Sequence, residues 1–207
     1  MPLLSEKCLF LHIPRTGGTS LSHSLIKSDV KCLSNVYTTE GTRYVLDHCT
    51  VEDLVNLKLL NKEDICNMYV FCCVRNTFDR LVSIYFHSGS INCPSFPKFI
   101  EELSVYKENT RRRLPTLTSC VDNLFVSQKE YLFFENKIIV NDIFHFENYY
   151  QMLEKLSTKF KRKVAINKYM NCSVNRKNDY RYYCTPDARK RVESIYAEEI
   201  DYFKFGY

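Results

Sequence analysis

Residues 8–21 read Cys8-Leu-Phe-Leu-His-Ile-Pro-Arg-Thr-Gly-Gly-Thr-Ser-Leu21, and this stretch decides the fold. The apolar run at 8–13 is typical of a short buried strand, and the proline and two glycines that follow it predict a turn. We expect a helix after the turn, capped by Thr19 or Ser20 and extending to about Lys27. In a strand, turn and helix of this kind, backbone N–H groups and the positive end of the helix converge on an anion.

A second strand, turn and helix is predicted farther along the chain. The apolar strand Tyr69-Val-Phe-Cys-Cys-Val74 ends at Arg75-Asn76, and the apolar residues of 78–85 follow at helical spacing. Additional strands are expected near 44–45, at 137–140 and at 142–146, and additional helices from Thr50, over 152–160 and from Pro186. Strands alternating with helices predict an α/β fold with a central, mainly parallel sheet flanked by helices. We expect residues 1–207 to form a single domain, with a helix and long loops at 88–127.

The composition is that of an ordered globular protein with a modest basic excess. Of its 207 residues, 29 are Lys or Arg and 24 are Asp or Glu, which gives a net charge of +5 and favours anionic ligands. We find neither a signal peptide nor a long apolar segment, so we expect no membrane insertion and a cytoplasmic location. The 10 cysteines contain no CxxC pair, and we interpret them as reduced, mostly buried thiols rather than disulfides or metal ligands.

The residues of the first turn have the chemistry of a phosphate site. Gly17 and Gly18 allow the backbone to approach an anion, and the hydroxyls of Thr16, Thr19 and Ser20 can donate hydrogen bonds to it. Arg15 can neutralise charge that develops on a phosphate when the adjacent bond breaks. The stretch is not a Walker A loop, because the G-x-x-x-x-G-K-[ST] spacing is missing.

The second strand, turn and helix also carries residues that can bind an anion. Arg75 ends a strand and Ser83 lies eight residues later, about two helical turns, so the two can share one anion if the turn folds Arg75 back over the helix. The neighbouring Asp79 and Arg80 would most simply form a solvated pair on the helix surface.

These two motifs resemble the 5′-phosphosulfate loop and the 3′-phosphate element of the carbohydrate sulfotransferases related to the heparan sulfate 2-O- and 6-O-sulfotransferases. The similarity extends over most of the chain through shorter patches, which are Asp47-His48, Gln128-Lys-Glu-Tyr-Leu132, Phe146-Glu-Asn148, Tyr182-Tyr-Cys-Thr-Pro186 and Asp201-Tyr-Phe-Lys-Phe-Gly-Tyr207. The resemblance implies a P-loop-like sulfotransferase fold. It also implies the sulfuryl donor 3′-phosphoadenosine 5′-phosphosulfate (PAPS), the product 3′-phosphoadenosine 5′-phosphate (PAP) and a carbohydrate or other hydroxyl-bearing acceptor, with no metal required.

The resemblance also suggests roles for individual residues. Arg15 occupies the position where this family usually has lysine; arginine stabilises a leaving phosphate but is a poor proton donor. His48 lies where the similar enzymes have a catalytic histidine and is our candidate general base, whereas His12 is interpreted as a buried structural residue. Arg181 and Tyr183, within 175–183, match the position of the family's late cofactor-covering loop.

Two other classes of function compete with this interpretation. A nucleotide phosphotransferase is disfavoured because the Walker A lysine is missing. A catalytically silent basic module that binds nucleic acid or sulfated glycan, for example through 111–113, would use the positive charge and the aromatic residues, although we expect no nucleic-acid partner.

Overall fold

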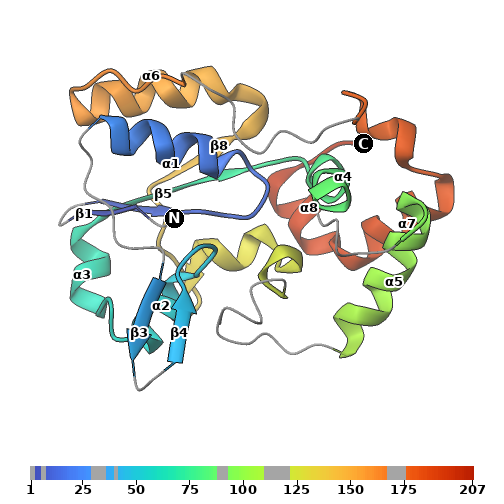
Figure 1. Ribbon diagram of the computed structural model, residues 1–207, viewed down its shortest axis with the longest axis horizontal. Helices are drawn as coiled ribbons and strands as arrows, with labels where there is room; N and C mark the ends of the chain where they lie inside the picture. The colour runs from blue at the N-terminus through green and yellow to red at the C-terminus, as the bar shows by residue number, and fades with distance from the viewer. Residues whose placement is uncertain are drawn as a thin grey trace. The chain divides into compact units, whose positions relative to one another are not determined.

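The computed structural model describes residues 3–5, 8–28, 36–39, 42–87, 93–109, 122–166 and 176–207, which form a mixed α/β protein (Figure 1). Its contacts divide the chain into two compact units. Unit 1 contains Met1–Val74 and Arg113–Asn171, and unit 2 contains Arg75–Arg112 and Cys172–Tyr207.

Unit 1 is built around a sheet with the strand order β1-β2-β5-β8. Strands β2, β5 and β8 are parallel, and β1 pairs with β2 in the antiparallel direction. Nearly every residue of β2 and β5 is buried, because both faces of these strands are covered, and this explains their almost continuous apolar sequence. The strands are β1 (Leu3–Ser5), β2 (Cys8–Leu11), β5 (Tyr69–Val74) and β8 (Asp142–His145).

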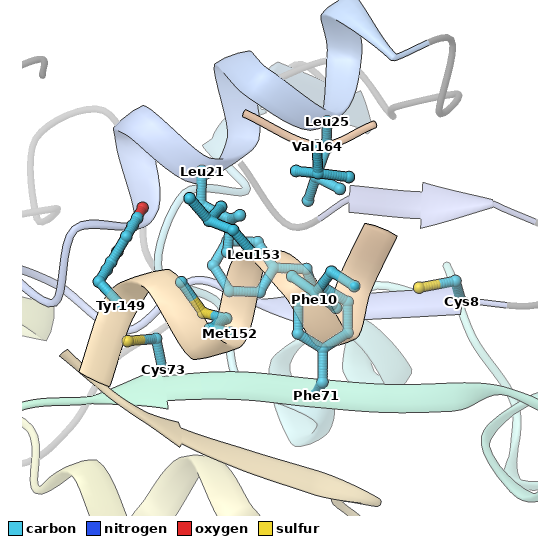
Figure 2. Packing of buried hydrophobic residues seen from close by; sticks show 11 residues of the cluster. Cys8, Phe10, Leu21, Leu25, Phe71, Cys73, Tyr149, Met152, Leu153 and Val164 are labelled. Atoms are coloured by element: carbon cyan, nitrogen blue, oxygen red, sulfur yellow. The ribbon is translucent and has the colours of Figure 1, made fainter. Parts of the chain in front are cut away.

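Two helices, α1 (Gly18–Lys27) and α6 (Tyr149–Phe160), cover one face of this sheet (Figure 1). Figure 2 shows Phe10 of β2 and Phe71 of β5 beneath the apolar sides of both helices. The two phenylalanine rings are stacked, with their centroids 5.0 Å apart. Burying a side chain of this size contributes about 1.5–3 kcal/mol, so this cluster is a main source of stability for the strand–turn–helix segment. Its buried members are Cys8, Phe10, Leu21, Leu25, Phe71, Cys73, Tyr149, Met152, Leu153, Leu156 and Val164.

The remaining elements of unit 1 are short. Helices α2 (Val51–Asn56) and α3 (Lys62–Asn67) both begin with a capping box, formed by Thr50 with Asp53 and by Asn61 with Asp64. Two hairpins form separate two-stranded sheets. The hairpins pair β3 (Val36–Thr39) with β4 (Thr42–Val45) and β6 (Phe133–Phe134) with β7 (Lys137–Ile138). The 3₁₀ helices are η1 (Asp122–Phe125), η2 (Gln128–Leu132) and η3 (Phe146–Asn148).

Unit 2 is mainly helical. Helix α5 packs against α7, and α4 packs against α5 and η4. Within this unit the Thr77 hydroxyl donates a 2.7 Å hydrogen bond to Oε1 of Glu199, and both side chains are buried. A buried carboxylate with a hydrogen-bond donor links the start of α4 to α8. The elements are α4 (Thr77–His87), α5 (Phe96–Asn109), η4 (Tyr180–Tyr183), α7 (Pro186–Ile195) and α8 (Ala197–Phe203).

The structure confirms the mixed α/β class, the parallel strands with flanking helices, and most of the predicted elements. The cap prediction was wrong: α1 begins at Gly18 with Gly17 as its N-cap, two residues before Thr19 and three before Ser20. The predicted strands near 44–45 and at 137–140 exist only as hairpin strands outside the main sheet. The last helix is interrupted at Tyr196, and α5 is the helix expected within 88–127, of which 88–92 and 110–121 lie outside the described residues.

The seven cysteines within the described ranges are free thiols, and five of them are buried. Burial raises the pKa of the Cys8 thiol to about 12, and it raises the pKa of Cys72 further. Cys32, Cys120 and Cys172 lie outside the described residues. None of the helices in the described ranges is both long and apolar enough to cross a bilayer.

Candidate functional site

The turn between β2 and α1 contains two residues with a left-handed backbone. Arg15 and Gly17 are both left-handed, with φ of 64° and 83°, while Thr16 between them is not. Alternation of this kind turns successive N–H groups toward one side, where they can hold an anion. The Thr16 hydroxyl donates a 2.9 Å hydrogen bond to the carbonyl of Ile13, and Tyr149 donates one of 2.9 Å to the carbonyl of Gly17. The hydroxyl of Thr16 therefore stabilises the turn itself.

The two glycines are required by packing inside the protein. A Cβ on Gly17 would lie 2.9 Å from atoms of both Phe146 and Tyr149, and one on Gly18 would lie 2.0 Å from Cδ2 of His12. We had expected these glycines to make room for a ligand. The structure instead shows that neighbouring side chains occupy the space a Cβ would need.

The N-terminus of α1 has no negative charge of its own. Gly17 has no side chain to accept a hydrogen bond from the first turn, and this turn contains no acidic residue. Helix α2, by contrast, has both Thr50 as a cap and acidic residues in its first turn. The positive end of α1, with Thr19 partly exposed and Ser20 buried beside it, is therefore suited to an external anion.

His48 lies against this turn although it follows His12 by 36 residues. Its Nδ1 is 2.8 Å from the carbonyl oxygen of His12, and the two imidazole rings meet edge to face with centroids 4.6 Å apart. A carbonyl oxygen only accepts hydrogen bonds, so Nδ1 carries the proton. In the neutral ring, Nε2 is then the basic nitrogen, the state that a general base requires.

His12 itself is buried and stays neutral. Burial lowers its pKa well below 6.5, and the nearby charges of His48 and Arg15 lower it further. This agrees with its interpretation as a structural residue.

Two side chains from a distant segment hold the backbone of His48. Its carbonyl accepts a 3.0 Å hydrogen bond from the Tyr131 hydroxyl and a 3.2 Å hydrogen bond from Nδ2 of Asn123. His48 is itself left-handed, with a φ of 68°. Sequence reasoning missed both partners. Tyr131 lies in 128–132, a stretch for which the sequence suggested no role, and Asn123 has no sequence signal.

The second predicted element belongs to unit 2 and contains a buried ion cluster. Nε of Arg75 lies 2.6 Å from Oδ2 of Asp79, and Asp79 also pairs with Arg176. The expectation of a solvated pair between Asp79 and Arg80 was wrong, because Arg80 is fully buried and Asp79 pairs with two other arginines. Ser83 is buried within α4. Asp79 is therefore shared by two arginines at the point where β5 ends.

The late segment presents its predicted residues differently. Arg181 is exposed, pairs with Asp179 at 3.3 Å and lies over the ring of Tyr180. The Tyr183 hydroxyl accepts a 2.7 Å hydrogen bond from the backbone N–H of Lys177, and its ring packs on Phe86. Residues 111–113 and Asn175 lie outside the described residues.

In the part of the chain that the structure describes, no group of three His, Cys, Asp or Glu side chains is arranged to hold a metal ion. No protein-family model, curated protein or solved structure matches this chain.

Proposed function

We propose that the protein is a sulfotransferase that moves a sulfuryl group from PAPS to a hydroxyl group of a carbohydrate acceptor. The observation that carries this proposal is the hydrogen bond from Nδ1 of His48 to the carbonyl of His12. This bond brings an imidazole with a basic Nε2 to the start of the turn between β2 and α1, which we propose binds the phosphosulfate group of PAPS. A module that only binds anions has no need of such a base.

Each group at the turn has a role in the proposed reaction. Nε2 of His48 takes the proton of the acceptor hydroxyl as its oxygen bonds to sulfur. The bond between sulfur and the bridging phosphate oxygen breaks in the same step. The turn amides and Arg15 stabilise the negative charge left on that oxygen, so PAP leaves as the product.

Arg75 and Ser83 are proposed to bind the 3′-phosphate that distinguishes PAPS from common adenine nucleotides. Asp79 supports this role because its 2.6 Å ion pair fixes the guanidinium of Arg75. Arg181 and Tyr183 are proposed to contact the nucleotide. Their exposed cation and aromatic ring suit a base and its phosphates.

Isothermal titration calorimetry tests the proposal by comparing PAP with AMP and ATP. We expect PAP to bind far more tightly, because a phosphate that gains a charge-assisted hydrogen bond contributes about 1.5–3 kcal/mol per bond. Mass spectrometry of candidate acceptors incubated with labelled PAPS then identifies the sulfated product. Salt-sensitive binding of oligonucleotides without a preference for PAP would instead indicate a basic binding module.

A further inference from the structure

The carbonyl of His48 is clamped by two buried side chains. Tyr131 is fully buried and Asn123 is 1% exposed, so bulk water does not compete for these bonds. They hold a residue with a φ of 68°, a left-handed backbone that is uncommon outside glycine, although histidine adopts it more often than most residues. The two side-chain hydrogen bonds hold this conformation together with the 3.3 Å bond from the backbone N–H of Cys49 to the carbonyl of Leu46, which closes the turn around His48.

Asn123 adds a second observation. Its Nδ2 must face the His48 carbonyl, because only the amide nitrogen can donate to it. Its Oδ1 is buried and has no hydrogen-bond partner among the residues that the structure describes. A buried acceptor without a partner destabilises a protein, which indicates that the position of Asn123 serves something other than stability.

We propose that Tyr131 and Asn123 are positioning residues for His48, an inference that rests on the function proposed above. Together they keep the backbone of His48 left-handed, which aims Nδ1 at the His12 carbonyl and leaves Nε2 as the basic nitrogen. Without them the backbone relaxes toward a common conformation and the ring leaves the His12 carbonyl. The imidazole can then adopt the tautomer that carries its proton on Nε2. In that tautomer Nε2 cannot take a proton from the acceptor hydroxyl.

The test is ¹⁵N NMR of the histidine side chains, without donor or acceptor present. The variants are Tyr131→Phe, Asn123→Leu and the double variant, each of which removes a donor while nearly preserving shape. We expect wild-type His48 to carry its proton on Nδ1 and the double variant to lose this preference. The rate constant kcat should fall about tenfold, part of the 10²–10⁴ typical of a general base, with KM for PAPS little changed and an altered pH profile.

Tyr69→Phe is the matched control. It also removes one phenolic hydroxyl from unit 1, but that hydroxyl donates to Asp142 and not to His48. Tyr69 is the first residue of β5, whereas the second predicted element follows the last residue of this strand. We expect this variant to keep both the wild-type tautomer and the wild-type pH profile.

A folded double variant with the wild-type tautomer and pH profile overturns the positioning role, as does a wild-type protein with its proton on Nε2. If the double variant does not fold, the tautomer and the pH profile of the single variants test the positioning role in the same way. If the single variants also do not fold, the tautomer of His48 in the wild-type protein is the remaining test. The NMR result does not depend on turnover. A tautomer change in a protein that transfers no sulfuryl group therefore supports the positioning role while contradicting the proposed activity.

Discussion

The imidazole of His12 occupies the space where a side chain on Gly18 would begin, with Cδ2 only 2.0 Å from the position of a Cβ. Because His12 is buried, its ring has little room to move away. The first residue of α1 and the first residue after β2 are therefore packed directly against each other.

We expect Gly18→Ala to lower the free energy of unfolding by about 1–3 kcal/mol, the usual cost of overpacking a core. Urea unfolding of the purified variant measures this loss. Gly206→Ala is the control, because a Cβ there meets nothing within 4 Å. Equal stability of the two variants would show that His12 yields easily.

His12 should also make stability depend on pH. Burial depresses its pKa in the folded state, whereas the unfolded chain binds a proton below about pH 6.5. Since the unfolded state then holds more protons, this contribution is complete above pH 6.5 and is lost as the pH falls, by at most about 1.4 kcal/mol per pH unit. Unfolding at several pH values checks this, and His12→Asn should show a shallower slope. An unchanged slope in that variant would assign the dependence to other groups.

The 3′-phosphate assignment predicts a selective loss of affinity. Arg75→Ala and Ser83→Ala should each weaken PAP binding by about 1.5–3 kcal/mol and leave AMP binding nearly unchanged, because AMP has no 3′-phosphate. Calorimetry measures both nucleotides. The control is Arg189→Ala, which removes an exposed arginine of the same unit that pairs with Glu193. Equal losses for PAP and AMP would remove the assignment.

Arg15→Ala and His48→Ala should both depress turnover, but with different pH dependence. Loss of Arg15 removes charge stabilisation in the transition state and should lower the rate about 10²–10³-fold at every pH. His48 acts only as the neutral ring, so the wild-type rate should rise with pH as the imidazole loses its proton, and this rise should vanish in His48→Ala. Rate profiles from pH 5 to pH 9 distinguish the two. Thermal melts and PAP affinity close to wild type are required first, and a folded His48→Ala that keeps both rate and profile would place the base elsewhere.

The sequence predicts best those features that depend on neighbours in the chain. The strand at 69–74 is recognisable because both of its faces are buried, and Thr50 is recognisable as a cap because Asp53 follows three residues later. The strand near 44–45 looks the same whether it joins the main sheet or a hairpin, so its partner could not be inferred.

The missed parts of the site depend on contacts between distant residues. Asn123 and Tyr131 reach a backbone carbonyl 75 and 83 residues away, and a carbonyl has no residue type that a sequence pattern can reveal. The left-handed backbone of His48 lies in a turn closed by a 3.3 Å hydrogen bond from the backbone N–H of Cys49 to the carbonyl of Leu46, and no glycine marks this turn in the sequence. Arg80 was misjudged because charged residues are rarely fully buried.

The reactivity of the buried cysteines in the sheet reports how often the strands β2 and β5 separate. The thiolate is the form that attacks an alkylating reagent, and burial raises the pKa of Cys8 and Cys72 so far that almost no thiolate forms in the folded state. The exposed Cys66 should react at once. Labelling of Cys72 should wait until β2 and β5 separate, so its rate under native conditions would time the transient exposure of the strands that frame the turn.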